Sequence, residues 1–483
     1  MLRPLSPEDS RRLVDFFSES GYNLTGVTGR HDLSERPSRY YGTIDLLLER
    51  TADPCAFHTL VRWFTIGVAQ PEVTARQHLP LWAIELLVQS GLLRRREHQL
   101  EPTAMLSPLG TMLVASDPVL KWEDNPADLV IWPNPTTHQL FNFTVRKEFE
   151  SALDLGCGCG VQALGAAPHC ESVLATDLNP RAAEFTAFNA RLNGIENVRS
   201  AAGDCFDPAG DSRFDLIVAN PPFFITPSSG LTYCENDLDL DLFSRRLARE
   251  APAHLTECGF FQMICEWVEI EGQPWRERIA EWMNATGCDA WVIKQYTMTP
   301  SKYGSERSHQ RPPGGARAFY SDWIAYSHRN QIIAIHGGLI TMRKRTGANW
   351  LRIDDRPVSL DAAVGDLILA GFRARDVLDS NQDGALLEAR PRLAAGVRLV
   401  QLLGASGQGW KQESLRLHLA GGMPRQIDID PGVAEFIAQF DGIRKLGDVI
   451  QAFAQKANAP PGRVTQESLA VTKRLLSDGY VEI

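Results

Sequence analysis

Apolar and polar positions follow two different periods along the chain, and the change from one to the other marks the expected strands and helices. Between residues 151 and 224, short apolar runs typical of buried strands alternate with segments of helical periodicity. Strands that alternate with helices favour a parallel sheet covered by helices on its faces. The first four strands are expected at residues 152–155, 172–176, 198–202 and 216–219.

The stretches on either side have other patterns. Residues 1–125 hold helix-like segments followed by a hairpin at 92–102, an order typical of a winged helix. A docking or dimerisation module is the interpretation that we prefer. Residues 346–483 combine alternating strands with amphipathic helices. Three apolar runs after residue 224 bring the central sheet to seven strands. We therefore expect an α/β protein with a Rossmann-like core at 126–345, an N-terminal helical or winged-helix-like module and a C-terminal α+β or winged-helix-like module.

Composition is that of a globular protein of the cytoplasm. The 483 residues are 44% hydrophobic and 22% charged, no apolar run is long enough to cross a membrane, and the N-terminus has no apolar signal core. Nine scattered cysteines without a C-x-x-C pair indicate free thiols in a reducing compartment. Cys157 and Cys159 have no second cysteine or histidine pair nearby, so we expect no metal site.

A glycine-rich turn and two acidic residues follow the first three strands. Gly156, Gly158 and Gly160 let the backbone take unusual dihedral angles and let a ligand approach without a Cβ in the way. Asp177, at the end of the second strand, is placed to accept hydrogen bonds from both hydroxyls of a ribose. Asp204 follows the third strand and suits an exocyclic amine or the edge of an adenine. The pattern predicts a cofactor that contains a nucleoside.

The glycine spacing fits two cofactors. Residues 158–163, with Asp177 about twenty residues further on, also match a dinucleotide fingerprint. Asp154 separates the two possibilities, because a carboxylate there suits the ammonium of an amino-acid-bearing cofactor and suits a pyrophosphate poorly. Asp204 and the sequence at 220–223 favour the same choice. These features together indicate S-adenosylmethionine.

Asn220-Pro221-Pro222-Phe223 follows the fourth strand. Asn and Pro favour turns, so a purely structural turn is one interpretation. In a catalytic interpretation, the Asn220 side-chain oxygen and the Pro221 carbonyl accept hydrogen bonds from a planar NH2 group and orient its delocalised lone pair toward the methyl group. Pro222 helps to fix the backbone, and Phe223 offers a face for stacking a base or an amide. We prefer the catalytic interpretation because the upstream pattern accompanies it.

Taken in order, these patterns resemble the motifs of class I S-adenosylmethionine-dependent methyltransferases. The last one is similar to that of the branch that methylates planar nitrogens, which includes adenine-N6 and guanine-N2 nucleic-acid methyltransferases and the glutamine-N5 methyltransferases of release factors and ribosomal proteins. The resemblance covers roughly residues 136–340. It assigns catalysis to Asn220, Pro221, Pro222 and Phe223, and cofactor binding to Asp154, Gly156, Gly158, Gly160, Asp177, Asp204 and Asn220.

Residues 301–317 are a candidate for contact with substrate. The segment is expected to form a long loop with four cations against one acid, and long loops in compact domains are often functional. Such a loop suits contacts with phosphate, although an ordinary surface loop is nearly as well supported. The cations are Lys302, Arg307, Arg311 and Arg317.

Two other candidates lie ahead of the core. The arginines at 94–96 suit a wing that contacts phosphate, with a solvated hairpin as the preferred interpretation. Thr137 and His138 precede the first strand, where enzymes of the resembled family often carry a segment that covers the methionine end of the cofactor. A simple helix cap explains Thr137 and His138 equally well.

Charge and motifs favour different acceptors. A net charge of −10 disfavours broad affinity for nucleic acid and suits a basic partner, such as a ribosomal protein or a release factor. Two flanking modules and a basic loop suit an extended substrate, so we place a base in nucleic acid first, RNA before DNA. Glutamine-N5 methylation of a protein is the close alternative. A non-catalytic scaffold that binds the cofactor and a small-molecule N-methyltransferase follow.

Overall fold

The computed structural model divides the chain into two compact units. The first comprises residues 1–141 and 147–356, and the second comprises residues 142–146 and 357–483. The division into three domains stays a prediction. The described residues are 2–29, 43–123, 127–227, 231, 233–309, 311, 314–355, 364–379, 383–407, 409–420 and 424–483.

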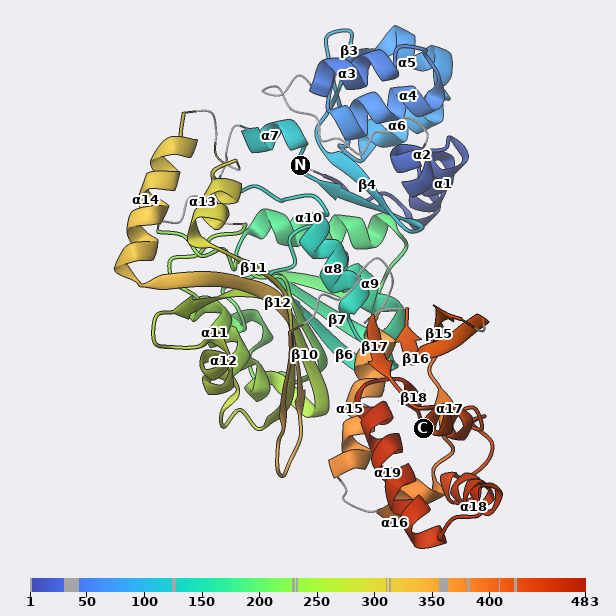
Figure 1. The fold of residues 1–483 in the computed structure, drawn as a ribbon. Helices are drawn as coiled ribbons and strands as arrows, with labels where there is room; N and C mark the ends of the chain where they lie inside the picture. Colours follow the sequence, from blue (N-terminus) through green and yellow to red (C-terminus); the bar gives the residue numbers. More distant parts are fainter. Residues whose placement is uncertain are drawn as a thin grey trace. The chain divides into compact units, whose positions relative to one another are not determined.

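The first unit is built on a mixed sheet of eight strands (Figure 1). The strand order is β13-β11-β12-β10-β9-β6-β7-β8. Strand β12 runs antiparallel to both of its neighbours, and the other pairs are parallel. The strands are β6 (Phe149–Leu155), β7 (Cys170–Asp177), β8 (Val198–Ala202), β9 (Phe214–Ala219), β10 (Leu255–Ile270), β11 (Cys288–Met298), β12 (Ile332–Lys344) and β13 (Leu351–Asp355).

This sheet confirms the expected Rossmann-like α/β core and has one strand more than the seven expected. The additional strand is β13, which pairs in parallel with β11 at the edge of the sheet. Strand β9 shows why continuous apolar runs become central strands here. Its residues Leu216, Ile217, Val218 and Ala219 are all buried, because helices cover both faces of the sheet.

Helices lie on both faces of the sheet. Figure 1 shows α8, α9 and α10 on one face and α11 and α12 on the other. Helix α10 begins at a cap in which the Asn179 side chain accepts a hydrogen bond from Arg181 N at 3.0 Å, and Pro180 occupies the first helical position. The helices are α8 (Pro135–Phe143), α9 (Val161–Ala166), α10 (Pro180–Leu192), α11 (Leu242–Glu250) and α12 (Trp275–Met283).

Two helices, α13 (Pro300–Ser308) and α14 (Ala316–Arg329), occupy most of the segment for which the sequence predicts a long loop. That prediction is wrong. Tyr303 and Trp323 are fully buried between the two helices and the sheet. Gly304 allows the close approach, because an added Cβ would lie 2.2 Å from the Trp323 ring. The polar composition of the segment hides a buried face that only the partner helix reveals.

The N-terminal residues contribute helices and hairpins to the first unit. Strands β2 (Leu93–Arg96) and β3 (Gln99–Pro102) form the expected hairpin. Each of its three arginines contacts a carboxylate, which favours the solvated hairpin over a phosphate-binding wing. The pairs are Arg94–Glu101, Arg95–Glu72, Arg95–Glu85 and Arg96–Glu101. The other elements are α1 (Pro7–Glu19), α2 (Leu24–Gly29), α3 (Thr43–Arg50), α4 (Ala56–Val61), β1 (Gln70–Pro71), α5 (Glu72–His78), α6 (Leu81–Gln89), β4 (Met105–Leu109), β5 (Met112–Ser116) and α7 (Val119–Glu123).

One hydrophobic core joins these N-terminal helices to the helices of the sheet. Leu13 of α1 and Leu87 of α6 belong to the same buried cluster as Leu164 of α9 and Phe188 of α10. The N-terminal residues therefore support the face of the sheet that carries α9 and α10.

The second unit is an α+β assembly, as its alternating and amphipathic segments predict. A three-stranded antiparallel sheet and a pair of short strands accompany five helices in the described residues. Phe436, Leu446 and Leu475 lie in its core. None of the helices in the described ranges of either unit has the length and apolarity needed to span a bilayer. The elements are α15 (Gly365–Asp379), α16 (Asp383–Glu388), β14 (Arg392–Leu393), β15 (Val397–Ser406), β16 (Gly409–Leu419), β17 (Arg425–Asp428), α17 (Pro431–Ile437), α18 (Leu446–Ala457), α19 (Pro461–Ser477) and β18 (Val481–Glu482).

Candidate active site

The carboxyl ends of β6, β7, β8 and β9 meet at one edge of the sheet. Leu155, the last residue of β6, pairs with residues of both β7 and β9. Gly156, Asp177 and Asn220 stand at the ends of these three strands and are therefore brought together. In open parallel sheets, ligands bind at this edge.

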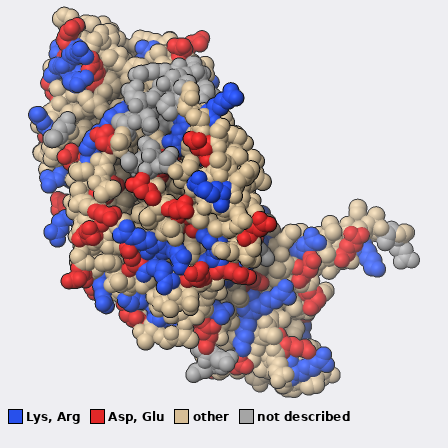
Figure 2. All heavy atoms as spheres, turned by 90° about the vertical axis from the view of Figure 1, so that its left-hand side faces the viewer, with Lys and Arg blue, Asp and Glu red and all other residues tan. Residues whose placement is uncertain are grey.

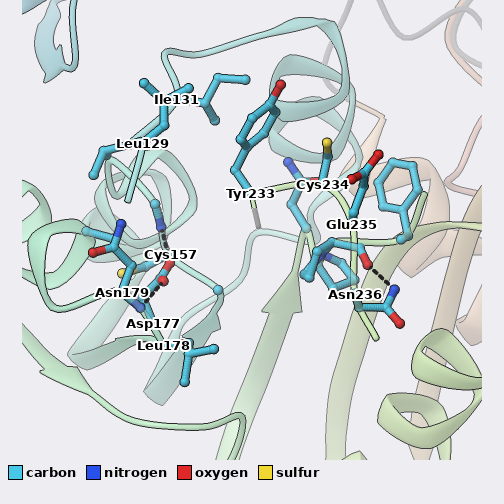
Figure 3. Close-up of a pocket in the computed structure, with 18 of the residues that line it drawn as sticks. Leu129, Ile131, Cys157, Asp177, Leu178, Asn179, Tyr233, Cys234, Glu235 and Asn236 are labelled. Atoms are coloured by element: carbon cyan, nitrogen blue, oxygen red, sulfur yellow. Dashed lines mark hydrogen bonds between the residues drawn. The ribbon is translucent and has the colours of Figure 1, made fainter. Parts of the chain in front are cut away.

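A cavity of about 900 Å³ opens there (Figure 3). Most of the site residues predicted from the sequence line it: Gly156, Gly158, Asp177, Asp204, Asn220, Pro221, Pro222 and Phe223. Asp154 and Gly160 are not among the described residues of the lining. Other parts of the wall, residues 127–132 and 234–237, were not singled out from the sequence.

The glycine turn presents bare backbone to the cavity. Gly156 and Gly158 have φ angles of +76° and +54°, a region that favours glycine. An added Cβ at Gly156 would have the Asn220 backbone oxygen at 3.9 Å as its nearest neighbour, and one at Gly158 would meet nothing within 4 Å. A ligand can therefore lie directly against this backbone.

Asp177 fixes the turn and keeps a carboxylate at the cavity. Its two oxygens accept hydrogen bonds from Gly158 N at 2.9 Å and Asn179 N at 2.8 Å. Burial raises the pKa of Asp177, and the two backbone hydrogen bonds oppose that shift. Gly203 N donates to the Asp177 carbonyl at 2.9 Å, and the next residue, Asp204, is an exposed carboxylate on the cavity wall. The acids after β7 and β8 thus lie near each other, as predicted.

Gly160 is expected to be the least replaceable glycine of the turn. Its φ is +85°, and an added Cβ would lie 2.9 Å from the side chain of Thr186. We expect Gly160→Ala to lower the free energy of unfolding by about 2–3 kcal/mol, the sum of backbone strain and a steric clash. Gly194→Ala is the matched control: its φ is +69° and nothing lies within 4 Å, so only the strain of about 1 kcal/mol applies. Urea unfolding of both variants measures the difference, and equal losses would contradict the role given to Thr186.

Asp154 lies beneath the glycine turn. It is only 2% exposed, and one carboxylate oxygen accepts a hydrogen bond from Ala163 N at 2.8 Å. The other oxygen, Oδ1, has no partner in the described part of the chain. Burial raises the pKa of Asp154 to about 7. A buried carboxylate with a free acceptor oxygen is suited to a cationic group.

The turn at 220–223 leaves two acceptors available. No described residue forms a hydrogen bond with the Asn220 side chain, and none donates to the Pro221 carbonyl. By contrast, the Pro222 carbonyl accepts a hydrogen bond from Asn236 Nδ2 at 2.6 Å. The Phe223 ring is largely buried at the cavity wall. The arrangement predicted from the sequence is therefore geometrically available.

Figure 3 shows two walls that face each other across the cavity. Asp177, Leu178 and Asn179 lie on one side, and Glu235 and Asn236 lie on the other. The first wall follows β7, and the second comes from the segment after the 220–223 turn. A cofactor and an acceptor therefore have separate places in one cavity.

The wall at 127–132 is held by a buried ion pair. Asp117 accepts two hydrogen bonds from the Arg181 guanidinium, at 2.6 and 2.8 Å, and a third from Val130 N at 2.9 Å. Thr137 also lines the cavity, while its N–H donates to the Asn134 side chain at 3.0 Å. The helix cap is therefore Asn134, and Thr137 lies in the first turn of α8 at the cavity wall. His138 is not among the described residues of the lining.

The expected phosphate-binding cations are largely neutralised. Arg307 and Arg311 each form an ion pair with a buried carboxylate, Glu266 and Glu235 respectively. Both arginine side chains are only 12% exposed. Lys302 contacts Glu306 on the same helix. Three of the four cations expected to contact phosphate therefore have carboxylate partners, while Arg317 is exposed.

Fold and site together define a class of protein. A largely parallel sheet, with a glycine turn after its first strand and acids after the next two at one cavity, is typical of proteins that bind a nucleoside-containing cofactor. We call the opposite wall of this cavity, which follows the 220–223 turn, the acceptor wall. Comparison with known proteins then gives the family. Residues 114–267 match the methyltransferase small domain, and residues 370–482 match a domain of unknown function (DUF7782).

Individual relatives agree with this match. The chain is 32% identical over 227 residues to the release factor glutamine methyltransferase of Salmonella typhimurium, an alignment that covers 43% of this chain and 78% of the relative. It is 37% identical over 131 residues to the ribosomal protein uL3 glutamine methyltransferase of Bradyrhizobium diazoefficiens, with 24% of this chain and 40% of that protein covered. A solved methyltransferase from Pyrococcus furiosus aligns with a TM-score of 0.27 at 20% identity over 44% of this chain and 82% of that one.

The chain belongs to the class I S-adenosylmethionine-dependent methyltransferases. It spans less than half the length of the Bradyrhizobium relative.

Proposed function

We propose that this protein transfers a methyl group from S-adenosylmethionine to the side-chain amide nitrogen of a glutamine in a protein. The observation that carries the proposal is the pair of available acceptors, the Asn220 side chain and the Pro221 carbonyl, on the wall of the cavity. The names of the matched relatives support glutamine rather than a base as the acceptor.

The residues present fit the cofactor. The bare backbone of Gly156 and Gly158 leaves room for a bound molecule, and the orphaned Oδ1 of Asp154 suits a cationic ammonium. Asp177 and Asp204 would hold the ribose hydroxyls and the adenine amine. When bound, S-adenosylmethionine supplies an electrophilic methyl group.

The residues of the turn act on the acceptor. The nitrogen of a planar amide has a delocalised lone pair, so it is a poor nucleophile until a binding site fixes its orientation. Asn220 and Pro221 accept hydrogen bonds from the two N–H groups, which directs the lone pair away from the amide plane. Phe223 packs against the amide and excludes water. Catalysis then rests on orientation and on fixed dipoles. The nitrogen loses one proton as it gains the methyl group, and because an N-methylated cationic amide is strongly acidic this proton passes to solvent without a strong base.

A basic protein of the translation apparatus is the partner that charge and relatives support. The net charge of −10 attracts basic surfaces. Figure 2 shows basic and acidic side chains intermixed over the described part of one face, which offers little for a phosphate backbone to follow. Nine free cysteines support a place in the reducing cytoplasm.

The proposal predicts where labelled methyl groups will be found. We expect the purified protein to transfer label from S-adenosylmethionine to the protein fraction of a cell extract, with N5-methylglutamine found after complete digestion by proteases, which leaves the side-chain amide intact. Separating the extract into RNA, DNA, protein and small-molecule fractions makes the measurement. Label in RNA would support the base-methyltransferase alternative, and label in the small-molecule fraction alone would replace both.

A further inference from the structure

A buried carboxylate organises the region behind the acceptor turn. Glu266 of β10 is 0% exposed. Its oxygens accept hydrogen bonds from the Tyr296 hydroxyl at 2.7 Å, from the Tyr303 hydroxyl at 2.6 Å and from the Arg307 guanidinium. Three donors from β11 and α13 thus satisfy one carboxylate, which fixes Arg307 in the plane of its hydrogen bonds.

Arg307 extends from this carboxylate to the cavity. Its guanidinium carbon lies 3.5 Å from the centre of the Phe224 ring, and Arg307 itself lines the cavity. A stack this close holds the aromatic ring against a rigid planar group. Phe224 in turn contacts Phe223 edge to face, with 5.3 Å between ring centres and an interplanar angle of 71°.

A second route joins α13 to the same stretch of chain. Ile225 N donates a hydrogen bond to the Tyr303 hydroxyl at 3.0 Å, and the same hydroxyl donates to Glu266. On the other side, Phe224 N donates to the Cys234 carbonyl at 2.8 Å. The residues directly after the acceptor turn are therefore held both by α13 and by the cavity wall.

We propose that α13 positions the methyl acceptor, with Glu266 and Arg307 fixing Phe224 and, through it, Phe223 and the turn that begins at Asn220. Arg307 is a positioning residue, because it acts through the two rings. This inference rests on the part of the proposed function that assigns acceptor binding to the turn. It does not depend on whether the acceptor is a protein or a nucleic acid. If the Phe223 and Phe224 side chains could move freely, the acceptor amide would be poorly oriented. The stack of Arg307 on Phe224 restricts their motion.

The test replaces the planar cation while keeping its charge. We expect Arg307→Lys to lower kcat by about tenfold, because a lysine keeps the ion pair and loses the stack. The affinity for S-adenosylmethionine, measured by calorimetry, stays unchanged. Expressing kcat per cofactor-binding site removes any contribution from unfolded protein. The initial rate of label transfer into the same cell extract, at saturating S-adenosylmethionine, serves as the assay, so the acceptor need not be known.

A matched control separates positioning from the general cost of altering a buried arginine. Arg343 forms a 2.7 Å ion pair with the fully buried Asp289 and is not among the described residues of the cavity lining. Arg343→Lys is expected to lower the melting temperature and to leave kcat per binding site unchanged. If Arg307→Lys behaves in the same way, α13 has a structural role only and the inference is overturned.

A double-mutant cycle tests the route through Phe224. Phe224→Leu is expected to lower kcat as far as Arg307→Lys does. The double variant should have a kcat only slightly lower than either single variant, and Phe224→Tyr should keep the rate of the unaltered protein. Fully additive losses would overturn the coupling. Transfer by the unaltered protein into RNA instead of protein would overturn the proposed function and leave these comparisons intact. No transfer into any fraction would overturn both.

Discussion

Replacing Asn220 by alanine is expected to lower the rate of methyl transfer by about a hundredfold to a thousandfold. The change removes one of the two acceptors that orient the acceptor nitrogen, and losses of this size follow the removal of a fixed dipole from a closed site. The affinity for S-adenosylmethionine should change less than about twofold, because the glycine turn and Asp177 are untouched. The Asn220 side chain bonds no described residue, so its loss leaves the fold without a new unpaired group.

Single-turnover kinetics and calorimetry together make the measurement. Asn236→Ala is the matched control, since Asn236 lies in the same cavity and its amide is already bonded to the Pro222 carbonyl. It should lower the rate far less than Asn220→Ala. Cofactor affinity lost in parallel with the rate in Asn220→Ala would contradict a role in orienting the acceptor. A full rate in that variant would favour the scaffold interpretation.

The parts of the site that follow strands were predictable from the sequence. Gly156 and Asn220 directly follow the apolar strands β6 and β9, Asp177 is the last residue of β7, and Asp204 comes two residues after β8. Parallel strands bring their carboxyl ends to one edge, so local patterns were sufficient to place these residues in one cavity. How deeply each side chain is buried was not predictable from the strand ends, because burial depends on what packs above the strand.

The acceptor wall was not predictable in the same way. Arg307 and Arg311 appear in the sequence as solvated cations within a polar stretch. Their partners, Glu266 and Glu235, lie 41 and 76 residues away along the chain. Neither pairing leaves a periodic signal: the first forms where α13 packs against β10, and the second joins the residues after α13 to the segment after the 220–223 turn. Arg307 and Arg311, which the sequence suggests as contacts for nucleic acid, therefore form ion pairs within the protein.

Asp154 is predictable in one respect and not in another. Its position two residues before the glycines can be read from the sequence, whereas its burial is set by the fold. In the unfolded chain its carboxyl has an ordinary pKa of 3.8, and burial raises the pKa in the folded protein to about 7. Well below pH 3.8 both the folded and the unfolded protein hold the proton, and there is no penalty. As the pH rises toward 7, the unfolded chain loses the proton while the folded protein retains it, so stability falls. The full penalty at pH 8 approaches about 4 kcal/mol.

Asp154→Asn is therefore expected to stabilise the protein without cofactor at alkaline pH. The amide oxygen can still accept the hydrogen bond from Ala163 N, and the ionisation penalty disappears. The gain in the free energy of unfolding should be near zero at pH 4 and should grow to several kcal/mol at pH 8, as measured by urea unfolding of both proteins. Part of this gain comes from Asp177, because repulsion by its carboxylate adds to the effect of burial on the pKa of Asp154.

The same variant should bind S-adenosylmethionine more weakly, because a neutral amide cannot balance an ammonium group. A gain in stability with a loss of cofactor affinity would identify Asp154 as a carboxylate kept buried for binding at the expense of the fold. A gain of equal size at pH 4 and pH 8 would show that ionisation is not its cause. Unchanged affinity would assign Asp154 to holding the start of α9 alone, and the ammonium would then need another counter-charge in the cavity.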